Sequence, residues 1–326
     1  MSYTNFRQNA VRGGVAATLI AGVCATAFFA FAGDEDERRA SAAASADLVI
    51  KGYLGSVEIR EGRSTSWDLD MGENLVPMVS VSEEGGRLIV DGGLDEGPRR
   101  CENNDRRFEL QMEDGPRRPI SAFPELVITM PAGADYALEI MGGQMEMAGA
   151  ANLSLDYFGC GDIKFGNVTD ILNLAVYGSG DVEGGSSGPA NILIRGSGDV
   201  VLGDIDGDAD IRIYGSGDVD VGEISGDTTL KIQGSGDIGL GSVQNLLNVD
   251  VAGSGDVDIG SGLLAALNID VLGSGDVQFN GEANDVSVLL KGSGDVYVAR
   301  SNGNRVVNRY GSGDVRIGSW RSDDDD

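Results

Sequence analysis

The chain has 326 residues, of which 52 are Asp or Glu and 24 are Lys or Arg, so its formal net charge is −28. Such a charge disfavours binding to nucleic acid and to anionic membranes, and it favours cations and basic partners. Histidine is absent, which removes the commonest general base near neutral pH and the commonest metal ligand.

The first 32 residues have the pattern of a signal peptide. An apolar, uncharged run at 13–32 follows two arginines, and Ala30-Phe31-Ala32 matches a small-x-small cleavage site. The run is also long enough for an uncleaved membrane anchor, but acidic residues follow it at once, which favours cleavage. We therefore expect an exported protein in the periplasm, at the outer-membrane surface or outside the cell, with a linker at 33–46.

Residues 47–135 predict irregular β-structure. Runs such as LVIKGYLGSVEIREG and GGRLIV alternate apolar and polar residues and are bounded by glycine turns. The polar segment 92–119 interrupts this pattern and holds six of the chain's 20 arginines. Those arginines can contact an acidic face of the protein itself or an anionic glycan or lipid head group, and the sequence leaves both open.

A four-residue word, Gly-Ser-Gly-Asp followed by Val or Ile, then recurs through the rest of the chain. Its eight copies begin at 178, 196, 215, 234, 253, 273, 292 and 311, and a degenerate copy with cysteine in the second place begins at 159. A regular spacing of 18 to 20 residues indicates a solenoid in which each repeat forms one turn.

Apolar residues alternate with polar ones on both sides of this word. Counted from its first glycine as position 0, the positions −4, −2, +4 and +6 are nearly always apolar, which is typical of strands with one buried face. We predict an all-β, single-stranded parallel β-helix, a solenoid with coils of about 19 residues, over 136–320. Less regular β segments precede it, and an acidic tail follows at 321–326. Val306 and Arg309 break the apolar pattern of the last coil, so we expect residues 305–320 to form a polar C-terminal cap.

One aspartate per coil falls in the same column. The glycines of the word would allow positive φ at a sharp corner, where the aspartate can accept hydrogen bonds from backbone amides. Alternatively, calcium, which prefers carboxylate oxygens, can bridge carboxylates that lie about 5 Å apart. We expect no cofactor, with calcium as the alternative. The calcium hypothesis names Asp181, Asp199, Asp218, Asp237, Asp256, Asp276, Asp295 and Asp314.

Three further sets of residues, the cysteines, the asparagines and the tyrosines, lead to separate expectations. Export would allow Cys101 and Cys160 to form a disulfide, and two unpaired thiols are the alternative. Asparagines at position −5 predict an amide ladder between coils. The tyrosines at position −1 lie on non-adjacent coils, so we expect isolated surface aromatics. The asparagines are Asn173, Asn191, Asn248 and Asn268, joined by Asp210, and the tyrosines are Tyr177, Tyr214 and Tyr310.

The order LVIKGYLGSVEIREG, GGRLIV, PELVITMPAG and then repeated GSGDV coils resembles the head GIN domain family, exported bacterial β-solenoid domains named after auto-transporter adhesins. The resemblance covers about residues 47–318. It implies an envelope location, and no catalytic residues carry over. We expect a non-enzymatic, adhesin-like surface module. Its partners would be an envelope or matrix polysaccharide or another surface protein, with no nucleic acid, and with membrane contact only through an uncleaved signal.

The alternative function is a calcium-dependent polysaccharide lyase or hydrolase. Paired carboxylates suit glycoside hydrolysis, and this chain is rich in regularly placed aspartates. Catalysis needs two carboxyl groups in different environments, however, and these aspartates are near-identical copies. We therefore expect no enzymatic activity.

Overall fold

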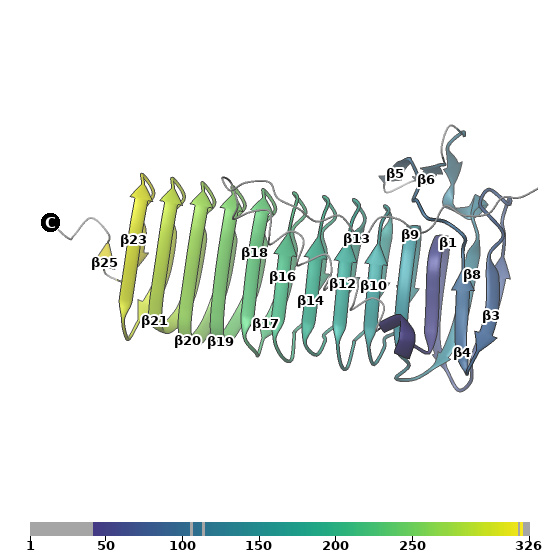
Figure 1. The fold of residues 1–326 in the computed structure, drawn as a ribbon, viewed down its shortest axis with the longest axis horizontal. Coiled ribbons are helices and arrows are strands. Elements are labelled where there is room, and N and C mark those ends of the chain that lie inside the picture. The colour runs from purple at the N-terminus through teal and green to yellow at the C-terminus, as the bar shows by residue number, and fades with distance from the viewer. Residues whose placement is uncertain (1–41, 105–106, 113–114, 319, 322–326) are drawn as a thin grey trace, which may run out of the picture. The chain divides into compact units, whose positions relative to one another are not determined.

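The computed structural model describes residues 42–104, 107–112, 115–318 and 320–321. These residues form a parallel β-solenoid of about ten coils with ~19 residues per turn, which confirms the predicted fold class (Figure 1). The predicted signal peptide lies outside the described residues, as do most of the linker and of the acidic tail. In the described part, no helix has the length and apolar character needed to span a membrane.

The strands before each GSGD word form one parallel sheet, here called sheet 1. Equivalent residues face each other across coils, so that Leu174 lies between Leu155 and Ile192. The strands follow one another along the solenoid (Figure 1). They are β4 (Arg87–Asp91), β1 (Leu48–Gly62), β9 (Tyr136–Met147), β10 (Leu153–Tyr157), β12 (Leu172–Val176), β14 (Ala190–Ile194), β16 (Ala209–Ile213), β18 (Thr228–Gly234), the later parts of β19 (Ile238–Gly253), β20 (Val257–Gly273) and β21 (Val277–Gly292), and β23 (Arg305–Gly311).

The strands after each word form sheet 2, also parallel. They are β8 (Glu125–Pro131), the later parts of β1 and β9, β11 (Asp162–Phe165), β13 (Asp181–Gly184), β15 (Val200–Leu202), β17 (Val219–Ile224), the first parts of β19, β20 and β21, then β22 (Val296–Ser301) and β24 (Val315–Ile317). A weaker third side is held by single bridges such as Val168 to Ser187. From β19 onward this side also pairs as continuous strand.

The core is a set of aliphatic columns that run through all the coils. Leu174, Val176 and Val182 are each at most 2% exposed, and equivalent residues are buried in the neighbouring coils. Full burial of one such side chain contributes roughly 1.5–3 kcal/mol. A single coil could not bury its own column, because the neighbouring coils supply the other contacts. Stacking therefore stabilises each turn.

Several short strands cover the ends of the sheets. β2 (Ser66–Asp70) pairs antiparallel with β8, and β3 (Ser80–Glu84) pairs antiparallel with β4. At the other end, β25 (Trp320–Arg321) pairs antiparallel with β24. Arg309 occupies an inward position in β23 and donates a hydrogen bond to the carbonyl oxygen of Gly313 at 3.2 Å. Most residues of β23 are exposed, as expected for a polar cap.

The arginine-rich segment forms a small sheet beside the solenoid. Its antiparallel strands are β5 (Arg100–Asn104), β6 (Arg107–Gln111) and β7 (Arg118–Pro119), followed by the 3₁₀ helix η1 (Ile120–Ala122). Leu110 and Phe123 pack with Leu54 and Met141 of the solenoid in a second buried cluster. Arg117 pairs with Glu102, so part of the basic charge is matched within this sheet.

Candidate functional site

The GSGD word is a corner at which adjacent coils approach closely. The third-position glycine is buried, and a Cβ at Gly255 would overlap the carbonyl oxygen of Gly236 in the preceding coil. First-position glycines have φ of 145–157° in the last five coils. Third-position glycines of the eight complete words do not have positive φ. The expectation of positive φ at both glycines is thus wrong for the third position and for the first-position glycines Gly178, Gly196 and Gly215, where close packing requires glycine instead.

The aspartate of each word caps a backbone amide. Its Oδ1 accepts a hydrogen bond from the N–H of the equivalent aspartate in the next coil, at 2.7–3.1 Å, in seven consecutive steps from Asp181 to Asp314. The residue after each aspartate makes the backbone hydrogen bond that is typical of the parallel sheet. For example, the Val219 N–H donates to the Asp237 carbonyl at 2.9 Å. The predicted role of the aspartate at the corner is confirmed.

Calcium along this column stays a prediction. Calcium takes six to eight oxygen ligands, and one oxygen of each column carboxylate from Asp181 to Asp295 is already bonded to an amide. Among the described residues, no group of three or more acidic or cysteine side chains is arranged to hold a metal ion. Metal titration is the direct test of the calcium hypothesis.

The corner presents regular columns of polar groups to solvent. The serines and aspartates of the words are exposed, whereas the glycine between them and the following Val or Ile are buried. We call these two columns, with the outward residues at position +5, the GSGD face. The +5 residues are Glu183, Val201, Asp220, Gly239, Asp258, Gln278, Tyr297 and Arg316.

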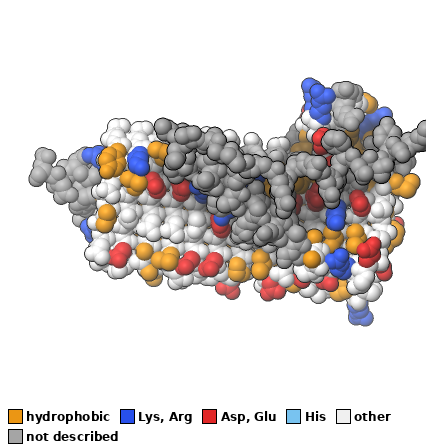
Figure 2. All heavy atoms as spheres, in the orientation of Figure 1, with side chains coloured by type: hydrophobic (Ala, Val, Ile, Leu, Met, Phe, Trp, Pro, Cys, Tyr) orange, Lys and Arg blue, Asp and Glu red, His pale blue; other side chains and the backbone are white. Residues whose placement is uncertain are grey.

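The charge of the solenoid is acidic over most of its length. Residues 119–290 contain only four basic side chains. On the side drawn in Figure 2, acidic side chains recur from end to end of the described solenoid. A long anionic ligand would meet repulsion along this body.

Sheet 1 carries two ladders on its outer surface. The Asn191 Nδ2 donates to the Asn173 Oδ1 at 3.0 Å, and the Asn268 Nδ2 donates to the Asn248 Oδ1 at 2.9 Å, so the amide ladder is confirmed for these two pairs. The expectation is wrong for Asp210, which pairs with Arg212 of its own strand instead. The second ladder lies at position −1. Its members are Phe158, Tyr177, Arg195 and Tyr214.

The expectation of isolated tyrosines is wrong for Tyr177 and Tyr214. Phe158 and Tyr177 stack with ring centroids 4.7 Å apart. The Arg195 guanidinium lies 5.8 Å from the Tyr177 centroid and 5.7 Å from that of Tyr214, and it therefore fills the intervening coil. Including arginine in the −1 column, as a cation that favours aromatic faces, would have predicted this stack.

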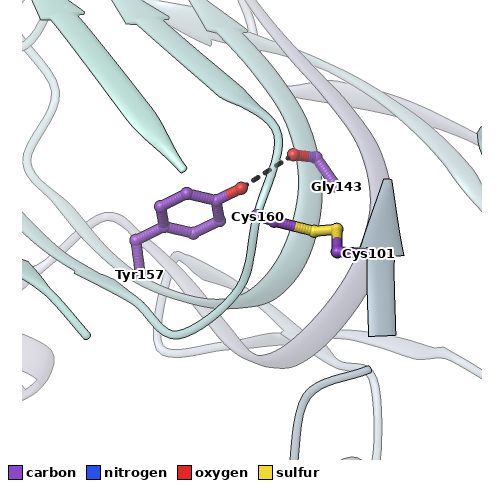
Figure 3. Close-up of a disulfide and its surroundings, with 4 residues drawn as sticks. All are labelled: Cys101, Gly143, Tyr157 and Cys160. Atoms are coloured by element: carbon purple, nitrogen blue, oxygen red, sulfur yellow. Dashed lines mark hydrogen bonds between the residues drawn. A yellow bond between two sulfur atoms is a disulfide. The ribbon is translucent and has the colours of Figure 1, made fainter. Parts of the chain in front are cut away.

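Cys101 and Cys160 are joined in a disulfide (Figure 3). Their Cα atoms lie 6.2 Å apart, and the bond links β5 to the degenerate word between β10 and β11. Beside it, the Tyr157 hydroxyl donates to the Gly143 carbonyl at 3.0 Å, and burial raises the pKa of Tyr157. The arginine-rich sheet is thus tied to the start of the regular coils.

The fold and its corners define a parallel β-solenoid with a repeated acidic face. Residues 221–319 match the family model described as "Putative auto-transporter adhesin, head GIN domain". The matched segment contains the last five GSGD words. The family resemblance is confirmed by this match. No curated protein matches the chain.

Proposed function

We propose that this chain is a non-enzymatic, adhesin-like module of the envelope or cell surface that binds a polysaccharide along the GSGD face. The observation that supports the proposal is the exposed Ser-Asp pair, which recurs on eight coils in fixed register. A polymer with repeated units could contact several coils at once, so that individually weak contacts combine. The matched adhesin family and the solenoid fold support the coarser class of surface module.

Rigidity of the face also favours binding. The aspartate side chains are held by hydrogen bonds from backbone N–H groups of the next coil. The backbone beneath them is paired with strands of the coils on both sides. Groups that are ordered before binding lose less conformational entropy when a ligand arrives. The GSGD face is therefore suited to many small contacts with an extended ligand.

A calcium-dependent polysaccharide lyase or hydrolase is the competing proposal. Glycoside hydrolysis needs a carboxylic acid and a carboxylate with distinct environments. The carboxylates from Asp181 to Asp295 each accept an equivalent hydrogen bond from a backbone N–H of the next coil. Their environments are therefore alike, and no two of them are suited to different catalytic roles. We therefore propose binding without turnover.

The test uses the full chain with insoluble cellulose, chitin and peptidoglycan. We expect the protein to sediment with at least one polymer and to release no reducing ends or unsaturated sugars. Asp258→Lys on the GSGD face should change binding, whereas Asp270→Lys, on the outer surface of sheet 1, should not. Both changes alter the net charge equally, so they form a matched pair.

Two outcomes would contradict this proposal. Release of sugar products by the wild type would favour the enzyme. A failure to bind any of the three polymers would remove the support for a polysaccharide ligand and leave another surface protein as the partner.

A further inference from the structure

The last three coils of the GSGD face differ from those before them. Upstream, the +5 position holds acidic or small residues or valine, from Glu183 to Asp258. In β21, β22 and β24 it holds Gln278, Tyr297 and Arg316, which line a hollow of about 410 Å³. Asp276, Asp295 and Asp314 line the same hollow.

Strand pairing places the three +5 residues in a row. Tyr297 lies opposite Gln278 on one side and Arg316 on the other, so successive residues are about 4.8 Å apart. Tyr297 is 36% exposed, although the corresponding positions of the earlier coils hold no aromatic residue. The +5 column is formed without an aromatic ring in the earlier coils, so the fold does not require one at Tyr297. We therefore consider a binding role for this side chain.

The carboxylates beside this row are fixed in position. The Asp276 Oδ1 accepts from the Asp295 N–H at 2.7 Å, and the Asp295 Oδ1 accepts from the Asp314 N–H at 2.9 Å. The second oxygen of each carboxylate can still accept a hydrogen bond from a ligand hydroxyl. The hollow thus combines an aromatic ring, an amide, a guanidinium and ordered carboxylates.

We propose that this hollow is a saccharide subsite, which takes a neutral or amino-sugar oligosaccharide; the inference rests on the proposed polysaccharide-binding function. The Tyr297 ring would pack on the apolar face of a pyranose. Gln278 and the aspartates would bind hydroxyl groups, and Arg316 would donate to ring or glycosidic oxygens. Three carboxylates face the Arg316 guanidinium and that of Arg309, which lies 3.4 Å from the Asp314 Oδ1, so one negative charge is left in excess. This excess disfavours uronates and sulfated sugars and favours the ammonium group of an amino sugar.

A larger hollow, of about 510 Å³, lies on the third side of the solenoid and is a weaker candidate. Its lining includes Leu263, Gln244 and Arg300. Arg300 pairs with Glu282, and the Gln244 Nε2 donates to the Glu223 Oε1 at 2.7 Å. A ligand there would have to replace contacts that the protein already makes, and no aromatic ring lines the space.

The test is calorimetric titration of the full chain with cellohexaose, chitohexaose, a glucosamine hexamer and, as the disfavoured class, a guluronate hexamer. We expect saturable binding of at least one of the first three. Tyr297→Ala should weaken that binding by about tenfold or more, because central aromatic contacts dominate such sites. Tyr310→Ala is the matched control, since Tyr310 is 65% exposed and does not line the hollow.

Thermal unfolding of both variants confirms that each is folded. Failure of all three sugars to bind, equal binding by Tyr297→Ala, or preferential binding of the guluronate hexamer would each overturn the proposal. Sedimentation with insoluble polymer separates the two levels of the account. If Tyr297→Ala binds the oligosaccharide as the wild type does while the wild type sediments with the polymer, the subsite is wrong and the polymer-binding function stands. If the wild type binds neither polymer nor oligosaccharide, the proposed function fails.

Discussion

Asp237 lies in the middle of the aspartate column and allows its carboxylate to be tested with two substitutions. Its Oδ1 accepts the Asp256 N–H at 2.7 Å, and its own N–H donates to the Asp218 Oδ1 at 2.8 Å. Asp237→Asn removes the charge but keeps an oxygen at the same place. Asp237→Ala removes both. The difference in unfolding free energy between the two variants therefore isolates the hydrogen bond.

The expected magnitudes follow from the spacing of the coils. Two carboxylates about 5 Å apart repel by roughly 0.8 kcal/mol in a water-like dielectric, so two neighbours destabilise Asp237 by up to ~1.6 kcal/mol before salt screening. A hydrogen bond contributes about 1 kcal/mol. We expect Asp237→Asn to raise the unfolding free energy at low salt, and Asp237→Ala to be about 1 kcal/mol less stable than Asp237→Asn.

Urea unfolding at low and high salt measures both quantities. Making the same change at Asp218, Asp237 and Asp256 together enlarges the difference beyond the error of the extrapolation. The gain of the asparagine variant should shrink in high salt, whereas the difference between asparagine and alanine should persist. Equal stability of the asparagine and alanine variants would refute the amide-capping role.

Three further predictions concern the core, the disulfide and the buried tyrosines. Thr228 occupies an inward position, and its hydroxyl has no hydrogen-bond partner within the described part of the chain. Thr228→Val should therefore raise the unfolding free energy by about 1 kcal/mol. A lower unfolding free energy of this variant, measured by urea unfolding, would contradict the prediction. Cys101→Ser opens a loop whose ends are 59 residues apart and should lower stability by up to about 4 kcal/mol; an unchanged melting temperature would contradict this. Burial raises the pKa of Tyr136 from 10.0 to about 12, so stability should hold below pH 10 and fall as the pH rises toward 12; ultraviolet titration that shows ordinary ionisation of every tyrosine would refute it.

The repeat period predicted the solenoid because each coil repeats the same inward residues. Leu155, Leu174 and Ile192 occupy one column in the sequence pattern, and they lie opposite one another in sheet 1. Parallel in-register pairing follows directly from such stacking. The third side was harder to predict, since much of it is held by single bridges between residues such as Ile205 and Ile224.

The small sheet β5–β7 and the subsite row could not be predicted in the same way. Polar segment 92–119 has no repeat, and the antiparallel pairing of Cys101 with Leu110 depends on tertiary packing under the disulfide. The GSGD residues are constant from coil to coil, whereas the +5 position varies, so the repeat pattern did not single out Tyr297. Its significance depends on the hollow beside it, which only the folded backbone defines.

Thermal unfolding of the full chain in millimolar calcium and in chelator tests the central claim most directly. The claim is that the GSGD word is a corner, in which carboxylates serve backbone amides, and that its exposed columns form a binding face. This account predicts the same melting temperature in both solutions. A large upward shift in calcium, lost when Asp218→Asn and Asp237→Asn are combined, would contradict the account and make the aspartate column a metal site.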